Sequence, residues 1–571
     1  MTQNNKYWVL LLSNFFNILI KVKTKNILII FSVLIGFQYF FVSRHSMSSD
    51  GMSYLDMARG FSEGNFNYLI NPLWSPLYPM FLGALLYIIH PNSYWEFTLC
   101  NFATYLTYLF ALLTFTFFLN QFLKYYHSKI NNEMLKISDS MFYAIGYIIF
   151  LQVSINIVTL WGLGPDILLS AFIYLAFGLL IKIYFKNDLS LFIAFGIVLA
   201  LGYLTKAVLF ILAFVFIFFA ISFNFKKNLL KGLFALVIFL VVSFPYIQSL
   251  SGSLGRLSFG ESGKINYVWY IDNIPIFTHW QGNDKYPEHG NPIHPTRIIF
   301  SNPNIYEFAS PIPGTYAPWF NPIYWYEGAK LTVLPMRQIA SMVKSLDVFV
   351  QIFIHKQIAL IVGFMLLFYV SNRVKTVFDG LKDTQMFLLP SFFAFFLLSN
   401  VHLEERYIGA FVVVLWLGLL MTIRMNNSEQ DKKLLKNILL AVFITLFFNF
   451  SCRTVRDIFN WSKNMPVHIE WVIAENLRVS GIKEGDKVAT IGYQIPESAY
   501  WASILKTKIV SEIIEEDMKA FWALTPEDRQ KAVNAFKSTG AKVLVSKEAP
   551  RNCIKEGWRY IPNTKSYFLL I

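Results

Sequence analysis

Charged residues and cysteines are both scarce in this sequence. Only 15% of its 571 residues are charged, whereas a soluble chain normally carries about 25%. The three cysteines, at positions 100, 452 and 553, match no metal-binding spacing. No internal repeat, nucleotide-binding loop or zinc motif is present, which argues against an ATP-driven machine. The scarcity of charge excludes an ordinary soluble protein.

Hydrophobic residues take the place of the missing charge. They make up 55% of the chain, and the mean hydropathy is +0.46. Several apolar stretches reach or approach the roughly 20 residues that a helix needs to cross hydrocarbon. The formal net charge of +14 does not indicate a nucleic-acid partner, because many lysines and arginines lie in short clusters between apolar segments. We therefore predict a multi-pass protein of a bacterial-type inner cell membrane.

The apolar segments predict an all-α polytopic bundle with about 11 transmembrane helices. The basic clusters between them all fall on one side, which the positive-inside rule assigns to the cytoplasm. His355 and Lys356 are polar residues within the apolar segment 350–371, which weakens the case for a span there. Residues 80–89 are short and bounded by prolines, so they are expected to be interfacial or re-entrant. The predicted spans are residues 27–43, 96–123, 140–160, 167–185, 189–204, 208–223, 232–248, 350–371, 385–400, 407–424 and 437–451.

The remaining segments divide the chain into three predicted parts. Residues 1–26 form a cytoplasmic or interfacial segment, whose apolar run lacks the small-residue site of a cleavable signal peptide. Residues 27–451 form the transmembrane domain, with a long extracytoplasmic loop over 249–345. Residues 452–571 form a small extracytoplasmic α/β domain, because residues 487–491 and 542–545 resemble buried strands.

Two aspartates lie at the predicted outer surface. Asp50 follows the first span, and Asp166 lies in the turn between the third and fourth spans. Either residue can simply cap the helix that follows it. The functional alternative makes Asp50 a general base, because a partly desolvated carboxylate has a raised pKa. Asp166 would then orient an acceptor or bind a divalent cation.

Two cations share this predicted surface. Lys206 runs against the positive-inside bias. It either snorkels to the interface or has an anionic partner such as a lipid phosphate. Arg406 either forms a local ion pair at a helix start or binds a phosphate through its guanidinium, with Glu405 as the glutamate that holds it in place.

Aromatic residues are concentrated in the long external loop. They either form an interfacial belt or stack on sugar rings or an isoprenoid. Three loop histidines fit no strong metal site, so no metal ligand is assigned and no cofactor is predicted, although a divalent cation stays open. The candidates for acceptor or sugar binding are Tyr54, Trp269, Tyr270, Trp280 and Trp325.

Together, these residues place two acids, a lysine and an arginine on one face of a membrane bundle. Sugar transfer from a lipid phosphate needs a base for the acceptor hydroxyl and cations for the departing phosphate. The chain resembles the GT-C superfamily of polyprenyl-phosphate-sugar-dependent glycosyltransferases, within it bacterial relatives of the protein O-mannosyltransferases and lipid A aminoarabinose transferases. The motifs that carry this resemblance, in order, are Asp50 with Tyr54 and Ala58, Pro76 to Pro79, Pro165-Asp166, Leu204 to Lys206 and Glu405 to Tyr407.

The resemblance covers residues 27–225, and beyond them only the Glu-Arg-Tyr motif carries it. It implies an inverting transfer on the extracytoplasmic face, from a polyprenyl-phosphate sugar to a glycan, lipid or protein acceptor that the sequence does not identify. It also implies that Asp50 is the catalytic acid of the first external loop and that Lys206 and Arg406 approach the donor phosphate. Members of the superfamily often have Asp-Glu at the first motif, whereas Gly51 follows Asp50 here.

Two other functions compete with this interpretation. An O-antigen polymerase or ligase would rely on arginines of the external loop, which has only Arg256, Arg297 and Arg337. A transporter or flippase for lipid-linked sugars would show repeats, broken helices and polar groups near the membrane midplane. The ionisable candidates here gather at one surface instead, which favours the transferase.

Overall fold

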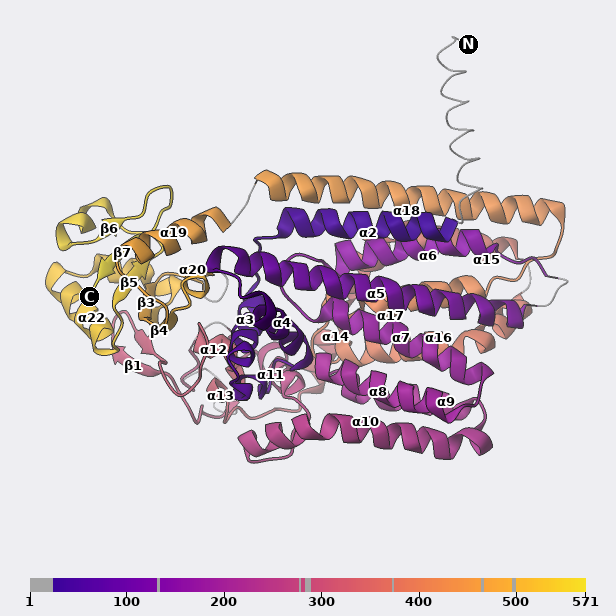
Figure 1. The fold of residues 1–571 in the computed structure, drawn as a ribbon, viewed down its shortest axis with the longest axis horizontal. Coiled ribbons are helices and arrows are strands. Elements are labelled where there is room, and N and C mark those ends of the chain that lie inside the picture. Colours follow the sequence, from indigo (N-terminus) through magenta and orange to yellow (C-terminus); the bar gives the residue numbers. More distant parts are fainter. Residues whose placement is uncertain are drawn as a thin grey trace, which may run out of the picture.

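The computed structural model describes residues 24–130, 134–276, 279–282, 289–371, 374–463, 467–494 and 500–571. Long helices form a bundle, and a mixed outer part caps one end of it (Figure 1). The C-terminus lies in this outer part. Most of the predicted N-terminal segment precedes residue 24 and lies outside the described residues.

The predicted spans coincide with helices, except that residues 350–371 fall on two helices bent at a break. The polytopic all-α bundle is therefore confirmed. In the described part of the chain, 7 helices are long and apolar enough to cross a membrane, or 8 if one bent pair counts as a single span. The prediction of about 11 spans also counted three shorter helices, α8, α9 and α17. The bundle helices are α2 (Thr24–Ser43), α5 (Ser93–Lys129), α6 (Asp139–Val153), α7 (Asp166–Phe185), α8 (Leu189–Thr205), α9 (Leu209–Ser222), α10 (Phe225–Leu254), α15 (Ile358–Val370), α16 (Val374–Ser399), α17 (Glu405–Met421) and α18 (Glu429–Lys463).

The bundle has a buried centre and an apolar periphery. The spans that contain α6 and α7 are each 83% buried within the protein, whereas those of α10 and α18 are each 28% buried. Through the middle of α10 the outward side chains are apolar and include Leu233, Val237 and Phe244. Apolar side chains suit a hydrocarbon surround, because hydrocarbon offers no partner to a polar group. The peripheral helices are therefore built to face lipid.

Two helices from the segment after α2 lie across the outer end of the bundle. They are α3 (Ser49–Ser62) and α4 (Leu77–Ile89), with the short turn η1 (Phe66–Leu69) between them. The Ser48 side chain caps α3 by accepting the Gly51 N–H at 3.0 Å. Gly83 lets α4 approach α3 closely, because a Cβ there would lie 2.6 Å from the Ala58 carbonyl oxygen. The cap fixes the start of α3, which carries Asp50, and the packing holds the rest of the helix against α4.

The outer part draws on both the long loop and the C-terminal segment. The loop contributes α11 (Ser262–Tyr270), β1 (Arg297–Phe300), β2 (Ile305–Glu307), α12 (Ala317–Phe320) and α13 (Pro322–Trp325). The helices that follow, α14 (Pro335–Phe349) and the π-helix η4 (Val350–Lys356), belong to the bundle, where they form a bent pair with α15 and pack beside α16 and α17. The C-terminal segment contributes α19 (Val467–Val479), β3 (Lys487–Ile491), α20 (Tyr500–Ile504), β4 (Lys508–Ile513), η5 (Glu515–Asp517), α21 (Met518–Ala523), α22 (Pro526–Ser538), β5 (Val543–Ser546), η6 (Arg551–Glu556), β6 (Arg559–Tyr560) and β7 (Tyr567–Leu570).

These strands form one sheet in the order β1-β2-β4-β3-β5-β7-β6. β4, β3 and β5 run parallel, and β2 pairs antiparallel with β4. The two segments that resembled buried strands in the sequence coincide with β3 and β5, and both are almost entirely buried. Two strands of the external loop thus complete the sheet of the C-terminal segment.

A buried ionic network ties this outer part to α3. Arg59 binds the Glu96 carboxylate of α5 through two nitrogens, at 2.6 and 3.0 Å. It also donates to the Ser503 carbonyl oxygen at 2.8 Å. Asp56 accepts the backbone N–H and the hydroxyl of Thr315 at 2.6 and 2.9 Å. The loop and the C-terminal segment are therefore held against the helix that presents Asp50.

Candidate active site

Four helix ends meet at the outer surface of the bundle, and each carries one charged candidate residue. Asp50 lies in the first turn of α3, and Asp166 is the first residue of α7. Lys206 immediately follows α8, and Arg406 lies in the first turn of α17. The four predicted residues therefore converge, although 356 positions separate Asp50 from Arg406.

Arg406 is the centre of this charged cluster. Its Nη1 atom lies 3.0 Å from the Asp50 carboxylate and 3.6 Å from the Asp166 carboxylate. Its Nε atom donates to Glu404 at 2.6 Å. One guanidinium thus bridges three carboxylates, which its planar array of donors allows.

Lys206 lies on the other side of Asp166. Its ammonium pairs with the Asp166 carboxylate and lies 3.9 Å from the centre of the Tyr407 ring, where a cation is attracted to the aromatic face. Asp166 therefore contacts both cations of the cluster. Of the two alternatives for Lys206, these contacts fit the one with an anionic partner rather than simple snorkelling, because the ammonium pairs with a carboxylate within the protein.

Burial changes the proton affinities of the cluster. The pKa of Asp50 is raised from 3.8, because burial outweighs the attraction of Arg406. Burial lowers the pKa of Lys206 from 10.5, against the attraction of Asp166. Burial also acts to raise the pKa of Glu404, but hydrogen bonds from His402 and Arg406 bring it to about 2. Asp50 is therefore a stronger base than a free aspartate, which is a property that suits a general base.

The structure explains why position 51 is a glycine, which the sequence alone did not. A Cβ at this position would lie 2.9 Å from the Leu163 Cβ and 2.8 Å from the Ser48 hydroxyl oxygen. A glutamate here would collide with the turn that leads to Asp166. The glycine allows the start of α3 to lie against this turn, which brings Asp50 and Asp166 to the same guanidinium.

Glu405 does not hold Arg406 in place, so the sequence-based prediction for this residue is wrong. The glutamate that holds Arg406 is Glu404, the residue just before α17. Glu405 instead pairs with Lys356 inside the bundle. Glu404 precedes the helix and has an extended backbone, whereas Glu405 begins the helix, so the two side chains point in different directions and Glu404 is the one that faces the cluster.

Of the aromatic candidates, Tyr270 lies at the rim of the cluster. Its ring stacks on His402 with centroids 3.6 Å apart, and His402 contacts Glu404 at 3.2 Å. Trp269, Trp280 and Trp325 are instead buried, with exposures of 7%, 7% and 8%. Trp269 stacks on Trp319, and Trp280 stacks on Tyr326. Trp325 donates to the Ala317 carbonyl oxygen at 3.2 Å.

Tyr54 is also buried, and it begins a continuous aromatic column. Its ring packs edge-on against Trp74 and Tyr78. Trp74 contacts Trp319, which joins the tryptophan stack of the loop. Because these rings contact one another, they form the core between α3 and the loop rather than an open sugar-binding surface. The predicted interfacial belt does not describe them either, since their faces are covered by protein.

No metal centre emerges among the described residues. There, no group of three or more His, Cys, Asp or Glu side chains is arranged to hold a metal ion. Asp166, the acid left open as a cation ligand, shares the Arg406 guanidinium with Asp50 instead.

No protein-family model and no curated protein matches the sequence. The fold, however, is similar to that of ArnT from Cupriavidus metallidurans. The structure of that protein bound to undecaprenyl phosphate has a TM-score of 0.50 at 10% identity, over 94% of this chain and 97% of that chain. Its apo structure has a TM-score of 0.51 at 11% identity, over 95% and 97%.

The chain has the GT-C fold. The apo oligosaccharyltransferase of Archaeoglobus fulgidus is also similar, with a TM-score of 0.45 at 11% identity, over 92% of this chain and 69% of that chain. The similarity to the two ArnT structures confirms the fold implied by the sequence motifs. Within this GT-C fold, the charged cluster occupies the outer ends of α3, α7, α8 and α17.

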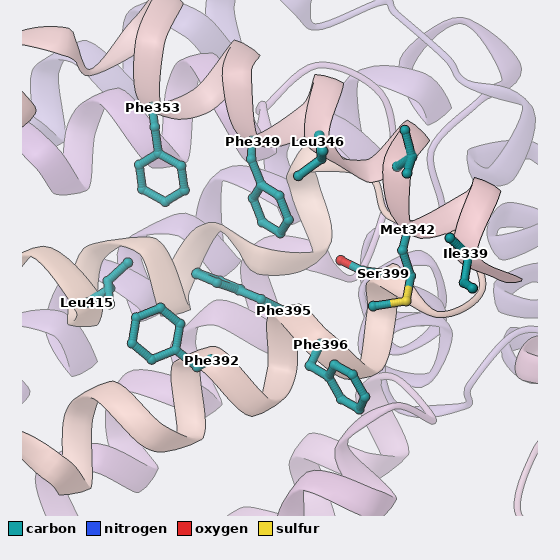
Figure 2. Close-up of a pocket in the computed structure, with 11 residues that line it drawn as sticks. Ile339, Met342, Leu346, Phe349, Phe353, Phe392, Phe395, Phe396, Ser399 and Leu415 are labelled. Atoms are coloured by element: carbon teal, nitrogen blue, oxygen red, sulfur yellow. The ribbon is translucent and has the colours of Figure 1, made fainter.

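A large apolar pocket lies among the helices of the GT-C bundle. Its volume is about 700 Å³, and its walls come from α14 and η4 on one side and from α16 and α17 on the other (Figure 2). At its outer end, Ser399 lies a few residues before the segment that carries Glu404 and Arg406. The residues that line it are Ile339, Met342, Val343, Leu346, Phe349, Phe353, Phe392, Phe395, Phe396, Ser399 and Leu415.

Proposed function

We propose that this protein is an inverting glycosyltransferase that moves a sugar from a polyprenyl-phosphate donor to a cell-envelope acceptor. The convergence of Asp50, Asp166, Lys206 and Arg406 at one point carries this proposal. The cluster contains a buried carboxylate with a raised pKa beside two cations. Those are the groups that sugar transfer from a lipid phosphate needs.

The two cations bind the donor phosphate. Arg406 contacts carboxylates in the absence of donor, and a phosphate offers the same fork of acceptor oxygens. When the donor binds, the phosphate takes over bonds of the guanidinium, and Asp50 is released. Asp166 contacts both cations, so it orients them toward the phosphate.

Asp50 then acts as the base. The acceptor oxygen attacks the anomeric carbon on the face opposite the phosphate, and its proton passes to the Asp50 carboxylate. The bond between the anomeric carbon and the phosphate oxygen breaks, and its electron pair leaves with polyprenyl phosphate. Lys206 and Arg406 stabilise the charge that develops on that oxygen. A single displacement of this kind inverts the anomeric configuration.

The apolar pocket supports a lipid donor. Its lining is almost wholly aliphatic and aromatic, and its volume of about 700 Å³ suits part of an isoprenoid chain. Its outer end lies close in the chain to Arg406, so a lipid in the pocket would present its phosphate to the cluster. A similarly folded protein, ArnT, has been solved with bound undecaprenyl phosphate.

The site is proposed to face the extracytoplasmic side of the inner membrane. Asp166 begins α7, and Lys186 follows its end. A helix of 20 residues spans about 30 Å, so these residues lie at opposite membrane surfaces. Lys186 belongs to the side that carries the basic clusters, which the positive-inside rule assigns to the cytoplasm.

The test uses purified protein in lipid nanodiscs with a panel of polyprenyl-phosphate sugars and cell-envelope extract as the acceptor source. Mass spectrometry follows the release of polyprenyl phosphate. Wild type should release it from at least one donor, and Asp50→Asn should not. Asp188→Asn is the matched control. Asp188 caps the N-terminus of α8, at the opposite end of that helix from Lys206, and asparagine caps a helix equally well. Full activity of Asp50→Asn would remove Asp50 as the base, and no release from any donor would refute the proposed reaction.

A further inference from the structure

A lysine lies inside the bundle at a break in one membrane segment. The bent pair runs from Pro335 to Lys356 and from Ile358 to Val370, and its axis turns by 77° at the break. Lys356 ends the π-helix η4 and is 9% exposed. A buried ionisable residue within a membrane segment is costly, so it marks a functional position by default.

Three elements meet at Lys356. Its ammonium pairs with the Glu405 carboxylate of α17. It also donates to the Asn156 carbonyl oxygen at 3.2 Å, in the π-helix η2 (Ser154–Val158) that continues α6. In return, the Gln152 side-chain amide donates to the Lys356 carbonyl oxygen at 2.6 Å. The lysine therefore joins η4, the end of α6 and the start of α17.

Stability does not explain this polar cluster. Both side-chain polar atoms of Asn156, the Gln152 Oε1 atom and the Gln357 Nε2 atom are buried without a hydrogen-bond partner among the described residues. Each such atom loses its hydration without compensation and destabilises the fold. Two π-helical segments also meet here, and π-helical turns are frequent at functional sites. A cluster that costs stability points to a role in function.

The cluster is linked directly to the proposed phosphate site. Glu405 is the first residue of α17, and Arg406 follows it. The Glu404 carboxylate holds the Arg406 Nε atom at 2.6 Å on one side, while Lys356 holds Glu405 on the other. Successive residues are thus fixed in different directions, which sets the rotation of the first turn of α17. That rotation decides whether Arg406 reaches Asp50 and Asp166.

We propose that Lys356 is a positioning residue that fixes Arg406 through Glu405. It contacts neither donor nor acceptor, and it acts by holding the start of α17. The proposal rests on the proposed function, since it assigns Arg406 to the donor phosphate. It also accounts for a broken, polar membrane segment without a transport step.

The first test combines substitutions in the transfer assay. Lys356→Met should lower kcat/KM for the donor by about 10–100-fold, because a displacement of about 1 Å at a reacting group has effects of this size. In an Arg406→Ala background, the same substitution should cause no further loss, since the two residues act through one contact. Lys356→Arg keeps the cation and should restore most of the activity. Lys344→Met, at an exposed lysine of α14, should leave the activity unchanged.

A structural measurement separates this proposal from the proposed function. The double variant Lys356→Met/Glu405→Gln leaves no unpaired charge in the membrane, so it should fold even if Lys356→Met does not. Its structure by electron cryo-microscopy in nanodiscs should show the Arg406 guanidinium displaced from Asp50. Retention of the Arg406–Asp50 contact, or losses that multiply in the Arg406→Ala background, would overturn the positioning role. A wild-type protein that transfers no sugar would overturn the proposed function, and the comparison of the two structures would still decide the role of Lys356.

Discussion

Arg406 offers the sharpest quantitative prediction, because one side chain joins both acids of the cluster. Replacing it by glutamine removes a bidentate, charge-assisted contact to the proposed phosphate. Such a contact contributes about 3 kcal/mol in total, and each 1.4 kcal/mol is a factor of ten. Arg406→Gln should therefore lower kcat/KM for the donor by about 100-fold. Arg406→Lys keeps the charge but loses the fork of donors, and about tenfold should be lost.

The same substitution should leave the protein folded. Removing one partner of a buried ion pair costs about 3–5 kcal/mol when the other charge stays unpaired. Here Asp166 keeps Lys206 as its partner, and Asp50 can take up a proton because its pKa is already raised. The cost should therefore fall below that range, and the variant should elute as a single species in size-exclusion chromatography.

The assay measures the release of polyprenyl phosphate as a function of donor concentration, with the acceptor saturating. Arg478→Gln is the matched control, because Arg478 forms an exposed ion pair with Glu475 at 2.7 Å on α19. Exposed pairs of this kind contribute at most about 1 kcal/mol, so this variant should match wild type. A folded Arg406→Gln protein with unchanged kcat and donor KM would refute the assignment of Arg406 to the phosphate.

Three further predictions follow from the same cluster and its supports. The pH profile of kcat/KM should be bell-shaped. Activity should fall at low pH as Asp50 takes up a proton, with a midpoint above the ordinary aspartate pKa of 3.8. Activity should fall at high pH as Lys206 loses its proton, with a midpoint below the ordinary lysine pKa of 10.5. Lys206→Arg should move the alkaline limb to higher pH, and an unmoved limb would exclude Lys206 as its source. Transfer should persist in EDTA, since Arg406 already joins the two acids that would otherwise hold a cation; loss of activity that Mg²⁺ or Mn²⁺ restores would contradict this. Arg59→Met should destabilise the fold, because Arg59 ties the C-terminal segment to α3 and its loss leaves the buried Glu96 carboxylate without its ion-pair partner; an unchanged melting temperature would contradict this.

The membrane spans could be predicted from the sequence because a helix that crosses hydrocarbon needs a long apolar run. The positions of Asp50, Asp166, Lys206 and Arg406 at one surface followed from alternating the direction of these spans. Their direct contact did not follow, because topology gives the depth of a residue in the membrane but not its neighbours across the bundle. The expectation that these residues share one site came from the ordered motifs, through their resemblance to a superfamily.

The choice between Glu404 and Glu405 shows where sequence reasoning reached its limit. Both residues are acidic and lie within two positions of Arg406, and their directions depend on where α17 begins. The decisive partner of Glu405 is Lys356, which is 49 positions away. The sequence did single out Lys356 as unusual within an apolar segment, so a signal was present, but it did not indicate the partner.

The external loop was the least predictable region, for two physical reasons. Its strands are only 3 and 4 residues long, too short for a clear alternation of apolar and polar residues. Its aromatic residues form a core with Tyr54 and Trp74, which come from a segment before the second span. Composition alone cannot distinguish an aromatic core from a sugar-binding surface, because both use the same side chains.

The balance of charge in the cluster bears on the order of substrate binding. Three carboxylates, Asp50, Asp166 and Glu404, surround the two cations. A donor phosphate adds further negative charge, and a nearby like charge raises the pKa of a carboxylate. Donor binding would thus release Asp50 from Arg406 and make it a stronger base at the same time. Because the base reaches full strength only with donor in place, an acceptor that binds first would meet a carboxylate still paired with Arg406. The geometry therefore favours donor binding before acceptor binding.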